Sequence, residues 1–153
     1  MVQLLPTAVI GARGYVGHAL SAELRRRGRT VLTPERGQEL SLVDAGPIDS
    51  LFYCAGYTAD YAHNPVATAE AHLGLLGRVL DALKPLRLVY LSSTRLLDSH
   101  PGQAVDDTSA LLLNPLLPRH LYDLTKAAGE SLCLAMVGER ARIARLSCIW
   151  SLD

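Results

Sequence analysis

Short apolar runs alternate with longer amphipathic stretches along the chain, and this alternation restricts the possible folds more than any other feature of the sequence. Runs that are apolar throughout are typical of strands buried on both faces of a parallel sheet, and amphipathic stretches are typical of covering helices. We therefore predict an α/β fold, a doubly wound parallel sheet with helices on both faces. The predicted strands span residues 7–11, 30–33, 50–56, 86–93 and 141–149, and the predicted helices span residues 14–28, 65–83 and 119–138.

The size of the chain fits one folding unit. It has 153 residues, of which 49% are hydrophobic, and this is ample for a single buried core. The sequence contains no internal repeat, low-complexity tract or evident linker. We expect residues 1–153 to form one domain.

The charge and hydropathy of the chain exclude two classes of partner. Fifteen basic residues balance fifteen acidic ones, so no overall field draws the chain to nucleic acid or to anionic lipid. The longest apolar stretch, residues 110–118, is interrupted by Asn114 and Pro115 and is too short to cross a membrane. We therefore expect neither a nucleic acid nor a membrane as a partner.

The three cysteines indicate a reducing compartment. Cys54, Cys133 and Cys148 are odd in number, widely spaced and each embedded in apolar sequence. This pattern fits reduced core thiols better than a disulfide framework or a metal site. We expect a cytoplasmic protein without a bound metal.

A glycine-rich loop joins the first predicted strand to the first predicted helix. Gly11, Gly14 and Gly17 are spaced three residues apart, and Tyr15 and Val16 lie between the last two. Glycines at such a turn let the chain bend sharply and let backbone N–H groups approach a pyrophosphate at the helix N-terminus. The spacing is GxxGxxG rather than GxGxxG, and an ordinary turn is the alternative. With a strand before it and a helix after it, the loop favours dinucleotide binding.

Tyr122 and Lys126 form the strongest candidate for chemistry. Lys126 is one of only two lysines in the chain, whereas the other basic positions are arginines. Residues four apart lie on one face of a helix, so the phenol and the ammonium can meet a common partner. A nearby positive charge lowers the pKa of a phenol, which could then exchange a proton with a substrate hydroxyl. The alternative is a packed tyrosine with an exposed lysine.

The order of four motifs resembles that of a known family. "GARGYVG", "CAG" after the third predicted strand, "LVYLSS" and "YDLTKAAGE" occur as they do in extended short-chain dehydrogenases/reductases, and the chain is similar to the NAD-dependent epimerase/dehydratase family from about residue 7 to residue 150. The resemblance implies a Rossmann fold that binds NAD(H) or NADP(H) and acts on a nucleotide-linked sugar. It also implies that Ala55 and Gly56, otherwise a strand end and a turn, lie beside the adenosine end of the cofactor.

The choice between NAD and NADP depends on three residues. An acidic residue about 20 positions past the loop holds the ribose diol of NAD, whereas an arginine there accommodates a 2′-phosphate. Glu35 and Arg36 both fall in this region, and Arg13 precedes the middle glycine. NADP-using relatives resemble the chain at Arg13, although both arginines could equally be solvated surface charges. We expect NADP with NAD as the alternative.

The resemblance also assigns roles to the reacting groups. It implies that Tyr122 is the catalytic acid/base, that Lys126 also bonds the nicotinamide ribose, and that Ser93 polarises the substrate oxygen, with Thr94 as an alternative to Ser93. His72 stands where the family has an asparagine, and we expect a partly buried structural histidine. We expect His120 to be a surface residue at a helix start.

The resemblance predicts an NAD(P)-dependent oxidoreductase or epimerase. Family members continue for about another domain, so the substrate-binding part is expected to be absent from these residues. A non-catalytic dinucleotide-binding module and a piece of a longer enzyme remain alternatives. The family also implies a homodimer through the helices at 65–83 and 119–138. Each of these carries three leucines or methionines that could form an apolar outer face or could equally pack on the sheet: Leu73, Leu76 and Leu80, and Leu132, Leu134 and Met136.

Overall fold

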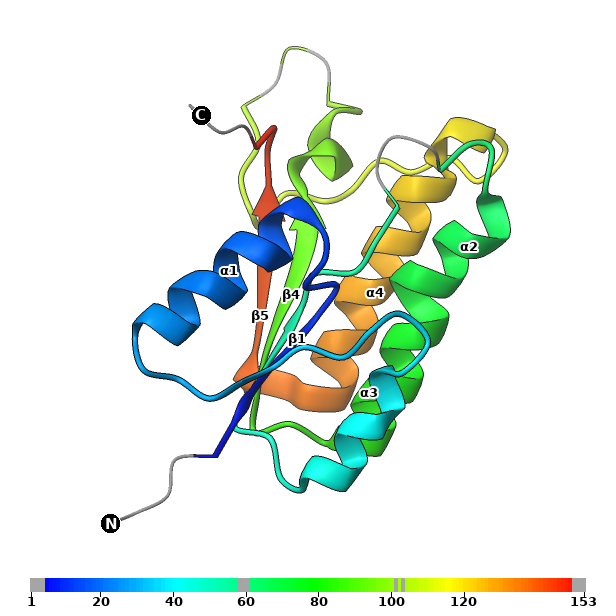
Figure 1. Cartoon of the computed structure of the whole chain (residues 1–153). Helices are drawn as coiled ribbons and strands as arrows, with labels where there is room; N and C mark the ends of the chain where they lie inside the picture. Colours follow the sequence, from blue (N-terminus) through cyan, green and yellow to red (C-terminus); the bar gives the residue numbers. More distant parts are fainter. Residues whose placement is uncertain (1–4, 58–60, 101, 103, 150–153) are drawn as a thin grey trace.

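One five-stranded parallel sheet forms the centre of the protein. The computed structural model of the chain describes residues 5–57, 61–100, 102 and 104–149. The strands are arranged in the order β2-β1-β3-β4-β5 (Figure 1). All four pairings are parallel, as predicted. The strand bounds are Thr7–Ile10 for β1, Val31–Leu32 for β2, Ser50–Tyr53 for β3, Arg87–Ser93 for β4 and Ala141–Leu146 for β5.

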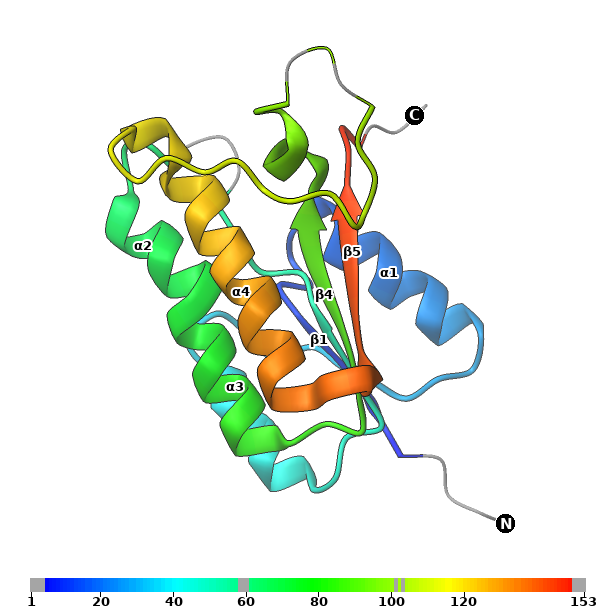
Figure 2. The same cartoon turned by 180° about the vertical axis from the view of Figure 1, so that it is seen from behind.

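Helices cover both faces of this sheet. α1 lies on one face, whereas α2, α3 and α4 lie on the other, as the two opposite views show (Figures 1 and 2). The arrangement confirms the predicted doubly wound α/β fold. The helix bounds are Tyr15–Arg26 for α1, Pro65–Ala69 for α2, Leu75–Leu83 for α3 and Leu121–Val137 for α4, and a π-helical turn, η2 (Glu70–Gly74), joins α2 to α3.

All five predicted strands are longer than the observed ones, three of them by two residues or more. β2 has only two residues, and β3 and β5 end three residues before the predicted ends. Past the hydrogen-bonded ladder, the chain runs into the loops at the carboxyl ends of the strands. Cys54 and Ala55 after β3 are half-buried, whereas residues 147–149 after β5 are exposed. A 3₁₀ helix that was not predicted, η1 (Glu39–Ala45), packs against α3 through the buried Leu42.

The π-helical turn brings α2–α3, α4 and the sheet into close contact. The hydroxyl of Tyr53 donates to the backbone carbonyl of Ala71 at 2.6 Å. The hydroxyl of Tyr90 donates to the backbone carbonyl of His72 at 3.4 Å. A Cβ atom on Gly129 would collide with the Tyr90 hydroxyl, so only glycine lets α4 approach this closely. Such turns occur frequently at functional sites.

The structure corrects the expectation about the cysteines and decides a question about the leucines that the sequence left open. Cys133 is buried, but Cys54 is only half-buried and Cys148 is exposed, so the thiols are not all in the core. Leu76 and Leu80 belong to the core rather than to an outer face. Periodicity alone could not distinguish the two faces of these helices, because both contain leucines.

No helix among the described residues is long and apolar enough to cross a membrane.

The strand order defines where a ligand can bind. The connection after β1 leads to β2 on one side, whereas the connection after β3 leads to β4 on the other, so the loops after β1 and β3 separate at the carboxyl edge of the sheet. Open α/β sheets bind ligands in the crevice at such a topological switch point. The glycine loop follows β1, which places it at this edge (Figure 1).

Candidate functional site

The glycine loop is shaped by two positions that accept no side chain. Gly11 has φ +82°, and a Cβ atom there would lie 2.7 Å from the backbone nitrogen of Ala55 in the loop after β3. A Cβ atom on Gly17 would collide with the carbonyl oxygen of Gly11. Gly14 has more room, since its Cβ would lie 3.4 Å from the same oxygen. The first and third glycines therefore pack the loop against α1 and against the β3 loop.

The start of α1 presents unpaired amides at this loop. The amide of His18 donates to the carbonyl of Gly14 at 2.8 Å. The amides of Tyr15, Val16 and Gly17 precede it and have no carbonyl one turn earlier in the helix. Such a helix N-terminus attracts anions. The side chain of Tyr15 is 57% exposed, so this residue would contribute its backbone rather than its ring.

A cavity of about 560 Å³ opens between the glycine loop and the loop after β3. It combines backbone from both loops with two arginines and one glutamate, and the π-helical turn and α3 form its far wall. Its lining residues are Gly11, Ala12, Arg13, Gly14, Pro34, Arg36, Glu39, Cys54, Ala55, Gly56, Tyr57, Ala71 and Leu75.

The charged residues at this cavity differ in part from those expected. Arg13 and Arg36 both border it, and the guanidinium of Arg36 donates to the Tyr57 hydroxyl at 3.1 Å. Glu35 is exposed and is not among the described residues that line the cavity, whereas the buried Glu39 is. Glu39 was missed because η1, which carries it, was not predicted.

Lys126 lies behind Gly56 at the wall of the cavity and is not among the described residues that line it. Its side chain is buried, and its Nζ donates to the carbonyl of Leu91 at 2.8 Å. A Cβ atom on Gly56, which lines the cavity, would lie 3.3 Å from this Nζ. Burial lowers the pKa of Lys126 to about 8, so the ammonium is easily deprotonated for a lysine.

Tyr122 and Ser93 meet beyond Lys126. The Tyr122 side chain is buried, and this burial raises its pKa, while a hydrogen bond with the Ser93 side chain and the positive charge of Arg95 lower it. Ser93 ends β4, and its Oγ accepts from the amide of Arg95 at 3.2 Å. Thr94 is exposed and directs its hydroxyl to the Leu146 carbonyl at 3.5 Å. The hydroxyl next to Tyr122 is therefore that of Ser93.

His72 is more deeply buried than expected. Its Nε2 accepts from the amide of Tyr57 at 3.2 Å, so the ring proton is on Nδ1, which lies 2.9 Å from the Thr125 hydroxyl oxygen. The ring meets that of Tyr122 edge-on, with centroids 5.1 Å apart. Burial lowers the pKa of His72 to about 3, so the ring is neutral near pH 7. It connects the β3 loop to α4.

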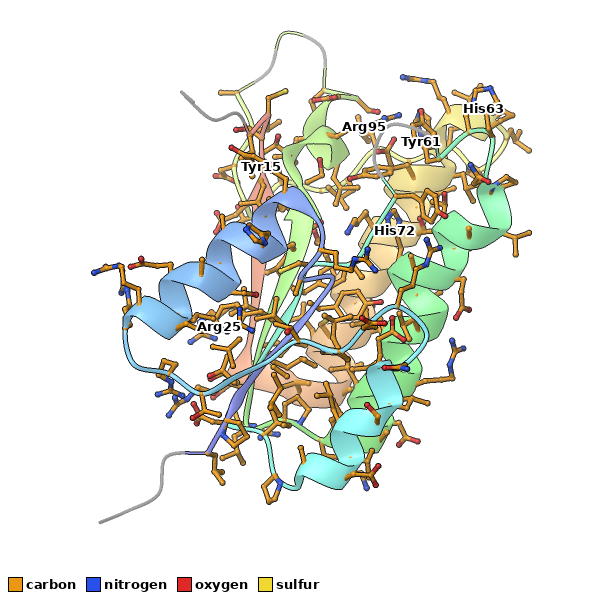
Figure 3. The ribbon with its side chains drawn as sticks, viewed as in Figure 1. Tyr15, Arg25, Tyr61, His63, His72 and Arg95 are labelled. Atoms are coloured by element: carbon orange, nitrogen blue, oxygen red, sulfur yellow. The ribbon has the colours of Figure 1, made fainter. Side chains whose placement is uncertain are left out.

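Arg95 and Tyr61 were not predicted to belong to the site. Arg95 lies in the 3₁₀ helix η3 (Thr94–Leu97), and its Nη2 donates to the Tyr61 hydroxyl at 2.7 Å. Its Nε is 3.2 Å from Oδ1 of Asp123, the residue after Tyr122. Figure 3 shows Arg95 and Tyr61 above the carboxyl ends of the strands, with His72 beneath them. An arginine two residues after the candidate serine was the only sequence signal.

Two further residues support the same helix. His120 is 3% exposed, and its Nδ1 accepts from the amide of Asn114 at 3.0 Å, so the expected surface role is wrong. Glu130 accepts two hydrogen bonds from Arg145 of β5, at 3.0 and 2.8 Å. Both contacts fix α4, which carries Tyr122 and Lys126.

Comparison with known proteins identifies the architecture. The model of the NAD dependent epimerase/dehydratase family matches residues 7–149. No curated protein sequence matches the chain.

Several solved structures have the same fold and about twice the length of this chain. A dTDP-4-dehydrorhamnose reductase from Bacillus anthracis str. Ames, in complex with NADP, has a TM-score of 0.78 and 18% identity over 96% of this chain and 55% of its own. A short-chain dehydrogenase/reductase superfamily protein from Agrobacterium tumefaciens with bound NAD has a TM-score of 0.72 and 25% identity over 91% of this chain and 48% of its own. A UDP-glucuronic acid 4-epimerase from Bacillus cereus, in complex with NAD, has a TM-score of 0.72 and 18% identity over 94% of this chain and 56% of its own. The chain thus spans about half the length of these proteins.

Proposed function

Because the chain belongs to the NAD-dependent epimerase/dehydratase family, we propose that it binds NADP(H) or NAD(H) and supports hydride transfer at a carbinol or carbonyl carbon of a nucleotide-sugar-like substrate. The observation that carries this proposal is the position of Lys126. Its ammonium lies against Gly56 at the cavity wall, on the same helix face as Tyr122, whose hydroxyl partner is Ser93.

The cavity fits a dinucleotide. Side chains at Gly11 and Gly17 would collide with the backbone, and Gly14 adds no side chain where the loop borders the cavity. The amides of the first turn of α1 could bind a pyrophosphate at this loop. A cavity of about 560 Å³ is within the size range of cofactor sites. The bound dinucleotide would supply a hydride acceptor or donor.

The side chains of this protein would move the proton. In the oxidation direction, the Tyr122 oxygen takes the proton of the substrate hydroxyl, and a hydride leaves the carbon that carries this hydroxyl. In the reduction direction, the Tyr122 oxygen returns the proton to the substrate oxygen. Ser93 donates a hydrogen bond to the substrate oxygen. Lys126 holds the ribose next to the nicotinamide and favours the phenolate form of Tyr122.

We also propose a preference for NADP(H) over NAD(H). Arg13 and Arg36 both border the cavity, and a 2′-phosphate would meet their guanidinium groups. Glu35, the candidate for binding a ribose diol, is exposed and does not line the cavity. Arg36→Gln should therefore weaken NADPH binding more than NADH binding.

A homodimer is the proposed assembly. Leu134 and Met136 on α4 are 53% and 41% exposed, which supports an apolar contact through this helix. Leu76 and Leu80 do not contribute to it, because they are part of the core.

A 4-keto nucleotide sugar with NADPH or NADH tests the enzymatic function. We expect oxidation of NADPH by the wild-type chain and a loss of kcat of about 100-fold or more in Tyr122→Phe, because general acid/base groups contribute at least that much. Ser93→Ala should also lose activity, whereas Thr94→Ala, a neighbouring hydroxyl directed at Leu146, is the matched control.

Binding and turnover together decide between the alternatives. Calorimetric binding of NADPH without turnover would favour a non-catalytic dinucleotide-binding module. Full activity in Tyr122→Phe would reject the proposed acid/base role of Tyr122. Absence of both binding and turnover would reject the proposed function for this chain.

A further inference from the structure

The ring of Tyr122 is enclosed by side chains from three other segments. Tyr61, after β3, lies 5.4 Å from it between ring centroids, and His72 of η2 lies 5.1 Å away. The guanidinium carbon of Arg95, in η3, lies 5.1 Å from the Tyr122 centroid and 4.7 Å from the Tyr61 centroid. Arg95 therefore contacts two aromatic rings, one of which carries the proposed acid/base.

Two hydrogen bonds and an ion pair hold the Arg95 side chain in this position. Its Nη2 donates to the hydroxyl of Tyr61 at 2.7 Å and to the carbonyl of Arg119 at 3.3 Å. Its Nε faces Asp123 at 3.2 Å. A planar guanidinium that stacks on aromatic faces and remains charged at any accessible pH is well suited to such a place.

Lys126 is directed elsewhere. Its Nζ donates to the Leu91 carbonyl and lies 4.9 Å from the centroid of Tyr90, beside the cavity wall at Gly56. The cation that lies on the Tyr122 ring is therefore Arg95, whereas Lys126 faces the proposed cofactor site.

We propose that Arg95 is a positioning residue for Tyr122 that also stabilises its phenolate form, and that Asp123 limits this effect by partly neutralising the guanidinium. The role rests on the proposed acid/base function of Tyr122. A cation next to a phenol favours its ionised form, and a carboxylate next to it opposes ionisation. Arg95 and Asp123 act on the phenol in these opposite directions.

The other polar groups around Tyr122 do not replace this pair. His72 is neutral because burial lowers its pKa to about 3. Asp98, Arg119 and His120 act on the carboxylate of Asp123. The groups that face the ring or its hydroxyl are Tyr61, His72, Ser93, Arg95 and Asp123, the last on the same helix as Tyr122.

Titration of Tyr122 by NMR tests the proposal without turnover. The full chain is labelled with ¹³C at tyrosine Cζ, and Tyr122→Phe assigns the resonance. At a pH just below the wild-type midpoint, we expect Arg95→Gln to reduce the phenolate fraction about three- to tenfold. This is the low end of the effect of a charge at 4–6 Å, because Arg95 is partly exposed. Asp123→Asn should raise the fraction, and Arg95→Lys should retain part of the wild-type value.

The opposite signs separate charge from structure. If Arg95 and Asp123 only held α4 in place, both substitutions would loosen the same contact and would change the phenolate fraction in the same direction. Arg145→Gln and Glu130→Gln are the matched controls, because they remove another ion pair between α4 and a neighbouring segment. We expect both controls to leave the Tyr122 titration unchanged.

The result also separates this inference from the proposed function. Opposite shifts without any turnover would support the role of Arg95 in tuning the phenol and reject the enzymatic function. Turnover with a titration unchanged in Arg95→Gln and in Asp123→Asn would overturn the inference alone. With turnover present, the pH profile of kcat for Arg95→Gln should move to higher pH, in step with the NMR midpoint.

Discussion

His72 connects three parts of the site through one neutral ring. It accepts from the amide of Tyr57, bonds the hydroxyl of Thr125 and packs edge-on against Tyr122. In the neutral ring, Nε2 accepts a hydrogen bond and Nδ1 donates one. A proton added to Nε2 would point at the Tyr57 N–H and would break the first of these bonds. The ring therefore stabilises the site only while it is uncharged.

This residue should make the protein sensitive to acid. Its pKa is lowered to about 3 in the folded state, whereas an unfolded histidine titrates near about 6.5. Between these values the unfolded state binds a proton that the folded state does not, so the free energy of unfolding falls as the pH falls. Linkage gives a loss of about 2 kcal/mol between pH 7 and pH 5 from this group.

Urea unfolding at pH 7 and pH 5 measures this loss. His72→Asn is expected to be less stable at pH 7, because it loses the bridge, but to lose about 2 kcal/mol less than the wild type on acidification. His18→Asn, at an exposed position of α1, controls for the removal of a histidine. Equal losses in wild type and His72→Asn would contradict the prediction.

At the scale of elements, α1 depends on its contact with the glycine loop. Gly17 lies inside the first turn of the helix, where alanine has a higher helix propensity by about 1 kcal/mol. The Gly11 carbonyl occupies the space that a Cβ at Gly17 would need, and this carbonyl is backbone that cannot rotate away. Steric overlap should outweigh propensity.

We therefore expect Gly17→Ala to lower the free energy of unfolding by about 1–3 kcal/mol, the usual cost of overpacking. Gly14→Ala is the matched comparison: its Cβ would lie 3.4 Å from the same oxygen, and its stability should stay within about 0.5 kcal/mol of the wild type. Chemical denaturation of both variants provides the measurement. Equal stability of Gly17→Ala and Gly14→Ala would show that the loop moves away from α1 at little cost.

At the scale of the whole molecule, the exposed face of α4 is the proposed contact between two copies. Leu134 and Met136 of this helix are both exposed. Charges placed there would have to be buried without partners in a dimer, at a cost of several kcal/mol.

Sedimentation velocity over a range of concentrations tests this assembly. We expect the wild type to dimerise and the double variant Leu134→Glu/Met136→Glu to sediment as a monomer. Leu116→Glu, at a residue 86% exposed outside α4, should dimerise like the wild type. A wild-type chain that remains monomeric at every concentration would reject the α4 contact.

The predicted elements agree with the structure where local pattern is sufficient. The strands, α1, the joined α2–α3 helix and α4 are all found within a few residues of their expected bounds. The expected bounds are too long at β2, β3 and β5, because an apolar run does not show where hydrogen bonding between strands stops. The helix η1 was not predicted, and for this reason the sequence pointed to Glu35 rather than to Glu39, the glutamate that lines the cavity.

By itself, the sequence determined the βαβ order, the glycine loop at a strand-to-helix turn and the spacing that puts Tyr122 and Lys126 on one helix face. These features depend on residues close together in the chain, so period and spacing are enough to specify them. Only the tertiary structure decided that Arg95 reaches Tyr61 across 34 positions and that His72 reaches Thr125 across 53. Such contacts depend on how strands and helices are stacked, and no local pattern encodes which distant side chains a buried ring will meet.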